Sequence, residues 1–65
     1  MKIRLNGENV ETGAATVALL LAERGISPVG TAVAVNESVV RRAHHACHEL
    51  KEDDRIEIIR AVQGG

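Results

Sequence analysis

A single stretch of this chain has the pattern of an amphipathic helix, and strand patterns lie on both sides of it. Thr16 is a suitable N-cap for the sequence VALLLAER, and Gly25 is a suitable residue to stop the helix. One stripe at helical spacing holds Val17, Leu20, Leu21 and Arg24, widened by Leu19. A helix must bury its leucines against another element, and in a chain of 65 residues a sheet is the only candidate.

The segments before and after this helix have the patterns of strands. Residues 2–5, KIRL, alternate polar and apolar side chains as a half-buried strand does. Asn6–Gly7 is a strong hairpin signal because both residue types accept positive φ angles, and ENVET reads as the return strand with Val10 inward. Residues 31–36, TAVAVN, form a small apolar run that is typical of a central strand. Residues 39–40 are expected to add a short strand.

The last predicted strand, RIEIIRAV, places Ile56 and Ile58 on one face and Glu57 and Ile59 on the other. The order hairpin, helix, strand, excursion, strand is an α+β layout with one helix across a small mixed sheet. It suits a β-grasp roll, in which the first and last strands pair in parallel at the centre. Periodicity alone does not establish that pairing. We expect one β-grasp domain over residues 1–65, with 63–65 as a flexible C-terminal tail.

Composition and charge exclude several classes of function. The net charge is −1 and the chain contains no aromatic residue, whereas nucleic-acid-binding domains usually carry a basic stripe and stacking side chains. Uncharged runs stay well below the roughly twenty residues needed to cross a bilayer, and the N-terminus lacks the apolar segment of a secretory signal. A single cysteine fits a reducing compartment. These features predict a small cytoplasmic domain without nucleic-acid or membrane partners.

The sequence HHACH, from His44 to His48, holds the residues that most resemble a reactive or metal-binding cluster. If the segment were helical, His44 and His48 would share a face, with Cys47 close to His44. Zinc, however, requires three or four protein ligands, and no motif supplies the others. A nucleophilic Cys47 would need an oriented base, which neighbouring residues rarely provide. A polar excursion with Cys47 small and buried or half-buried is the favoured interpretation, so we predict no metal site and no catalytic residue.

The chain ends in RAVQGG, and a terminal Gly64–Gly65 has two interpretations. It is either a frayed terminus or a thin arm whose carboxylate enters a narrow channel of another protein. A free α-carboxylate is ionised at neutral pH, so it can attack the α-phosphate of ATP and form an acyl-adenylate. Arg60 lies close to this tail and could meet an acidic groove of a partner. A chain of this size is too small for a deep pocket of its own, so the chemistry would belong to the partner.

Several stretches together resemble the ubiquitin-like sulfur carriers of thiamine biosynthesis, the ThiS family. They are MKIRLNGENVE, TVALLL, VAVNESVVRR and, most specifically, LKEDDRIEIIRAVQGG. The resemblance implies a β-grasp fold and a non-enzymatic cycle at Gly65, with Gly64 as its slender neighbour. An E1-like adenylyltransferase would use ATP to activate the carboxylate, and a sulfurtransferase or cysteine desulfurase route would convert it to a thiocarboxylate. Thiazole synthase would consume the sulfur. Ile59 and Ala61 are candidate docking residues, and no cofactor is expected to bind.

The chain departs from the family pattern at three positions, and other functions stay open. Many relatives have proline where this chain has Arg41, an aromatic residue where it has His45, and glycine where it has Asp53. The main alternative is a sulfur carrier of another pathway, similar to the small subunit of molybdopterin synthase. A non-covalent β-grasp interaction module, or a small metal-binding protein using the His–Cys cluster, would be a different class.

Overall fold

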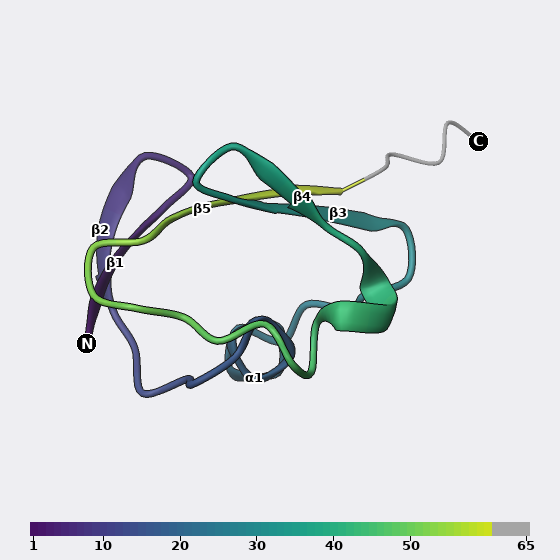
Figure 1. Ribbon diagram of the computed structural model, residues 1–65, viewed down its shortest axis with the longest axis horizontal. Helices are drawn as coiled ribbons and strands as arrows, with labels where there is room; N and C mark the ends of the chain where they lie inside the picture. Colours follow the sequence, from purple (N-terminus) through teal and green to yellow (C-terminus); the bar gives the residue numbers. More distant parts are fainter. Residues whose placement is uncertain (61–65) are drawn as a thin grey trace.

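The computed structural model, which describes residues 1–60, contains one five-stranded sheet and one main helix (Figure 1). The sheet order is β2-β1-β5-β3-β4, and only β1 and β5 run parallel. The elements are β1 (Lys2–Leu5), β2 (Glu8–Glu11), α1 (Val17–Glu23), β3 (Thr31–Val35), β4 (Ser38–Val40), the 3-10 turn η1 (Arg42–His44) and β5 (Arg55–Arg60). This arrangement confirms the predicted α+β β-grasp layout, including the central parallel pair.

Helix α1 begins and ends where the sequence predicted, with a specific cap at each end. Thr16 Oγ1 accepts a hydrogen bond from the Leu19 amide at 3.2 Å. At the other end, the Ile26 amide donates to Leu21 O and the Gly25 amide donates to Ala22 O, at 2.8 and 3.1 Å. These two bonds form a Schellman motif, which requires a left-handed residue at Gly25, and its φ is 70°.

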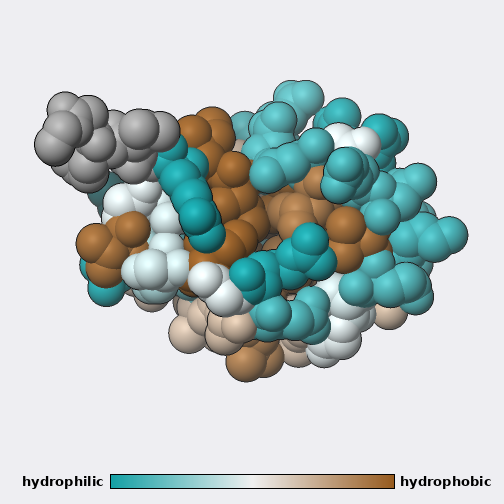
Figure 2. Space-filling view, turned by 180° about the vertical axis from the view of Figure 1, so that it is seen from behind, coloured by the Kyte–Doolittle hydropathy of each residue, from teal (hydrophilic) through white to brown (hydrophobic). Residues whose placement is uncertain are grey.

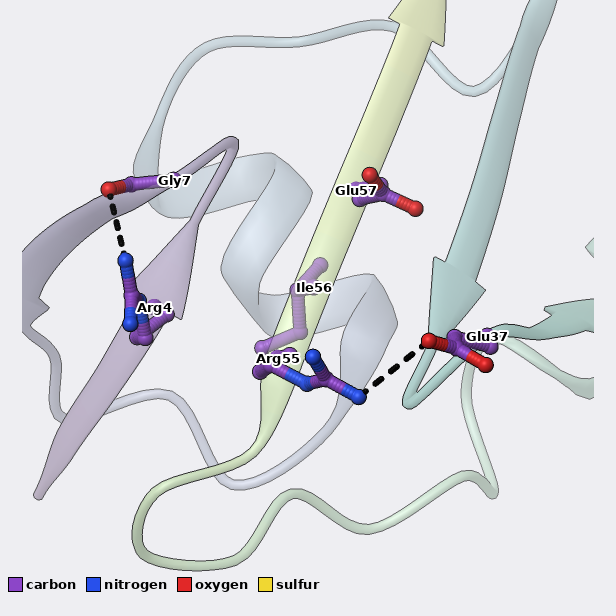
Figure 3. Close-up of a pocket in the computed structure, with 6 residues that line it drawn as sticks. All are labelled: Arg4, Gly7, Glu37, Arg55, Ile56 and Glu57. Carbon is purple, nitrogen blue, oxygen red and sulfur yellow. Dashed lines mark hydrogen bonds and ion pairs between the residues drawn. The ribbon is translucent and has the colours of Figure 1, made fainter.

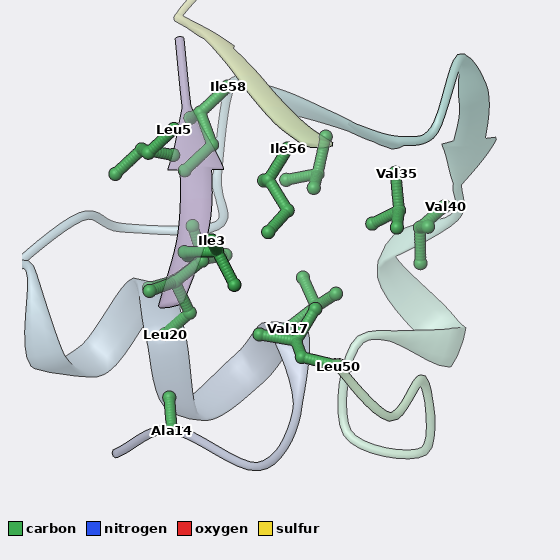
Figure 4. Close-up of a cluster of buried hydrophobic side chains, with 12 residues drawn as sticks. Ile3, Leu5, Ala14, Val17, Leu20, Val35, Val40, Leu50, Ile56 and Ile58 are labelled. Carbon is green, nitrogen blue, oxygen red and sulfur yellow. The ribbon is translucent and has the colours of Figure 1, made fainter. Parts of the chain in front are cut away.

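The core lies between α1 and one face of the sheet (Figure 4). Its fully buried side chains are Ile3, Val17, Leu20, Val33 and Ile56. Only aliphatic residues and alanine fill this space, which fits the absence of Phe, Tyr and Trp. The opposite face of the sheet has no helix over it, as Figure 1 shows for the described residues.

The excursion between β4 and β5 packs against the start of α1. Its only helical turn is η1, and the turns that follow carry the chain past the first turn of α1. His48 O accepts a hydrogen bond from the Val17 amide, and His45 O accepts one from the Ala18 amide. The first amides of a helix lack partners within it, so these carbonyls satisfy groups that would otherwise be unpaired. The excursion is therefore part of the capping of α1.

Candidate functional site: the end of β5 and the open face of the sheet

Two asparagines hold β5 in place, one on each side of the strand. Asn6 follows β1, and its Oδ1 accepts from the Ile58 amide at 2.8 Å, while its Nδ2 donates to Ile58 O at 3.4 Å. Asn36 follows β3, and its Oδ1 accepts from the Arg55 amide at 2.9 Å. Both asparagines have a φ of 50°, a left-handed conformation that asparagine tolerates better than most residues. Each side chain therefore continues the pairing of β5 where a neighbouring strand has ended.

The turn before β5 is fixed by the buried carboxylate of Asp54. Its Oδ1 accepts from Asn36 Nδ2 at 3.0 Å, and its Oδ2 accepts from the Lys51 amide at 2.8 Å. The preceding residue, Asp53, has a φ of 68°. This angle gives a physical reason for the glycine of the family pattern at that position, because glycine adopts positive φ without a Cβ penalty. Asp53 therefore carries a backbone strain that glycine would not.

The open face of the sheet exposes apolar side chains on its β5, β3 and β4 strands. Ile59 is 66% exposed and lies opposite Ala32, and Val39 is 76% exposed and lies opposite Ala34. The predicted position of Ile59, on the face of the strand opposite Ile56 and Ile58, is thus confirmed, and its role in docking stays a prediction. Val39 was not singled out from the sequence, although its alternation with the buried Val40 could have placed it on this face. The other predicted site residues, Ala61, Gly64 and Gly65, lie outside the described residues.

The open face also has a hollow near the start of β5, drawn in Figure 3. Arg4 and Arg55 are partners across the parallel strands, and Glu37 and Glu57 line the same hollow. Arg55 Nη2 lies 3.3 Å from Glu37 Oε2, and both side chains are largely exposed, so this ion pair contributes little to stability. The two arginines and two glutamates balance in formal charge, which makes this hollow a poor match for a strongly charged ligand.

The His–Cys segment does not form the cluster that a helix would have produced. Cys47 is exposed, so the expectation of a buried or half-buried thiol is wrong; its Sγ lies 3.4 Å from His44 O. His45 is the buried residue, and its Nε2 lies 3.1 Å from Val40 O. A carbonyl can only accept, so Nε2 carries the proton of this bond. Among residues 1–60, no three His, Cys, Asp or Glu side chains come together as metal ligands.

Two departures from the family pattern have a local explanation. Arg41 has a φ of −66°, the value at which a proline ring would hold it, and an extended ψ of 148°, so arginine here keeps a conformation that suits proline without the ring. His45 occupies the place of an aromatic residue and lines an apolar groove with Leu21 and Ala18 of α1. Its ring thus supplies apolar surface while its Nε2 satisfies a strand carbonyl.

Taken together, the sheet order and the single helix place this chain in the ubiquitin-like β-grasp class of small α+β domains. Its sequence matches the model of the ThiS family over residues 3–65. The chain therefore belongs to the ThiS family, the non-catalytic sulfur carriers of thiamine biosynthesis. Within residues 1–60, no helix has the length and apolar character needed to span a membrane.

Comparisons with individual proteins agree with the family. A crystal structure of a thiamine biosynthesis protein (ThiS) from Geobacter metallireducens superposes with a TM-score of 0.86 at 25% identity, covering all of both chains. An NMR structure of a thiamine biosynthesis protein from the same organism gives 0.81 at 23% identity, covering all of this chain and 88% of the other; it supports the fold. A thiazole synthase of Magnetococcus marinus is 42% identical over 67 residues. That match covers all of this chain but only 20% of the relative's length.

Proposed function

We propose that this chain carries sulfur as a thiocarboxylate on Gly65 and delivers it for thiazole formation in thiamine biosynthesis. The observation that carries the proposal is the family match, which extends to the terminal Gly64–Gly65. The geometry supports it, because β5 is held on both sides up to Ile58 and ends at Arg60. The five residues that follow can span at most roughly 18 Å when fully extended. That length suits a carboxylate that must reach a nucleotide inside another protein.

The proposed cycle begins with attack of the Gly65 carboxylate on the α-phosphate of ATP, held by an E1-like adenylyltransferase. Pyrophosphate leaves and an acyl-adenylate forms. The terminal sulfur of a persulfide from a sulfurtransferase or cysteine desulfurase route then displaces AMP and forms an acyl disulfide. A thiol of the partner cleaves the S–S bond, which leaves a thiocarboxylate on the carrier and a disulfide on the partner. Gly64 has no side chain, so it adds no width to the arm that enters the channel. The carrier contributes the terminal carboxylate, and its partners contribute the catalysis.

The proposed consumer of the sulfur is thiazole synthase. A region similar to this chain makes up about a fifth of a protein named thiazole synthase in Magnetococcus marinus, which supports a direct relation between the two functions. Ile59 and Val39 give the open face of the sheet an apolar surface for such a partner. Apolar side chains at the centre of an interface are typical of protein docking. Ala61 is proposed to extend this surface toward the tail.

Intact-mass spectrometry tests this function directly. The full chain is incubated with a thiamine-pathway adenylyltransferase, ATP and a sulfur donor, beside a chain that lacks Gly65. We expect a mass gain equal to the replacement of one oxygen by sulfur, only in the chain with Gly65. An absence of this gain, while a known carrier is modified in the same mixture, would contradict the assignment. Modification by a molybdopterin-pathway adenylyltransferase instead would favour the carrier of another pathway.

A further inference from the structure

Two hollows border the end of β5 and a third adjoins them, and among residues 1–60 their only charged lining residues are arginines. One lies beside the strand end and is lined by Ile59, Ala32 and Arg42; a second, across the start of β3, is lined by Val29 and Arg60. Gly30 and Thr31 line both, and Thr31 is the partner of Arg60 in the sheet register, so the two hollows flank the point where the chain leaves β5.

The third hollow extends this surface from the open face toward α1. It is an apolar groove between α1 and the excursion, lined by Leu21 and His45 among others. Pro28 and Arg42 line both this groove and the hollow beside Ile59, so the two adjoin. Figure 2 shows apolar surface open to solvent close to where the described part of the chain ends. The surface near the tail is therefore apolar with two cationic groups, Arg42 and Arg60.

These two arginines lack an internal counter-charge in the part of the chain that the structure describes. The one ion pair among residues 1–60 joins Arg55 to Glu37, at the end of the sheet where β5 begins. Glu52 also lies at that end, where its carboxylate accepts from the Lys2 amide. Of the residues that the structure describes, no acidic side chain lines any of the three hollows. The net charge of the chain is −1, but the two charged side chains that line these hollows are both arginines.

We propose that Arg42 and Arg60 form a basic rim around the exit of the tail, which docks onto carboxylates at the mouth of the adenylyltransferase channel. This inference rests on the proposed carrier function and names the partner surface. An acidic mouth by itself would repel the anionic terminus of the carrier. The positive charge of the rim, in which Arg60 lies five residues before the terminus, offsets this repulsion. It also determines how far the tail enters the channel. The same carboxylates would bind a carrier without this positive charge more weakly, because unlike charges attract and like charges repel across an interface.

The test measures ATP–pyrophosphate exchange by a purified thiamine-pathway adenylyltransferase as a function of carrier concentration. The variants are Arg42→Glu, Arg60→Glu and the double substitution, and Arg4→Glu is the matched control at the other end of the sheet. We expect the double variant to raise KM for the carrier by about tenfold or more, because electrostatic steering changes encounter rates by that order. The value of kcat should change by less than about twofold, since the proposed contacts of both arginines are with the mouth of the channel and not with the reacting groups.

Salt dependence and conservative substitutions separate docking from a loss of structure. Arg42→Lys with Arg60→Lys should restore most of the affinity, because the charge is kept. Raising the salt from about 0.05 M to 0.5 M should raise KM for the wild-type carrier and lower KM for the double Glu variant, because salt screens both the attraction and the repulsion. Both arginines are exposed, so far-UV circular dichroism should show the double variant folded.

Three results would overturn the rim. The first is an unchanged KM in the double variant, and the second is an equal rise of KM in Arg4→Glu. The third is a double variant that loses binding to thiazole synthase while its ATP–pyrophosphate exchange stays normal. Failure of the carrier function itself has a different signature: the wild-type chain would then support no exchange at any concentration, while a known carrier does.

Discussion

Replacing Asn6 by glycine tests whether one side chain holds the end of β5 in place. The bonds at stake join Asn6 Oδ1 to the Ile58 amide at 2.8 Å and Asn6 Nδ2 to Ile58 O at 3.4 Å. Both are partly buried, and leaving such an amide without its partner costs about 1–3 kcal/mol. The longer bond contributes little. Glycine accepts the φ of 50° at this position, so the backbone itself adds no strain.

We expect Asn6→Gly to lower the free energy of unfolding by about 2 kcal/mol. A domain of this size has a total stability of roughly 3–10 kcal/mol, so the loss is a large share of it. The midpoint of thermal unfolding should fall by roughly 8–16 °C. Asn6→Asp keeps the Oδ1 acceptor for the Ile58 amide, and should therefore lose less than half as much.

The assay is urea unfolding followed by far-UV circular dichroism, because the chain has no tryptophan or tyrosine to report by fluorescence. Hydrogen exchange at the Ile58 amide gives a local measurement, and its protection should fall in Asn6→Gly. Asp53→Gly, at a φ of 68°, measures what glycine alone does at a left-handed position. If Asn6→Gly stays within about 0.5 kcal/mol of the wild type and the Ile58 amide keeps its protection, the reasoning is refuted.

Three further outcomes follow from burial and backbone angle. Asp53→Gly should stabilise the chain by about 0.5–1 kcal/mol in urea unfolding, because it relieves a positive φ; a lower midpoint would contradict the strain. Leu20→Ala, at a side chain with no exposed surface, should cost about 2–5 kcal/mol in the same assay. Leu19→Ala, at a side chain that is 53% exposed on the same helix, is its control. An equal loss of stability in this variant would contradict the assignment of Leu20 to the core. Ile59→Ser should leave unfolding unchanged and weaken carrier binding to its partners in isothermal titration calorimetry; unaltered binding to both partner enzymes would remove Ile59 from the docking surface.

The parts of the fold that could be predicted are those in which neighbouring residues decide the outcome. Thr16 and Gly25 cap α1 as expected, since a cap bonds amides and carbonyls within one turn of itself. Ile58 and Ile59 lie on opposite faces of β5 because side chains alternate along any strand. The excursion could not be predicted in this way. Its shape depends on the hydrogen bonds that the carbonyls of His45 and His48 accept from amides of α1, which lie about thirty residues earlier in the sequence.

The same distinction between local and long-range determinants applies to the candidate site. The sequence alone determined the Gly-Gly end, the family match and the face of the strand on which Ile59 lies, because these depend on residue identity and on strand alternation. Only the tertiary structure decided that Arg42 lies in the hollow beside Ile59 and that Asn6 continues the pairing of β5. Such contacts join segments far apart in the chain. They form because burying one aliphatic core brings those segments together, and no local pattern records which polar groups then become neighbours.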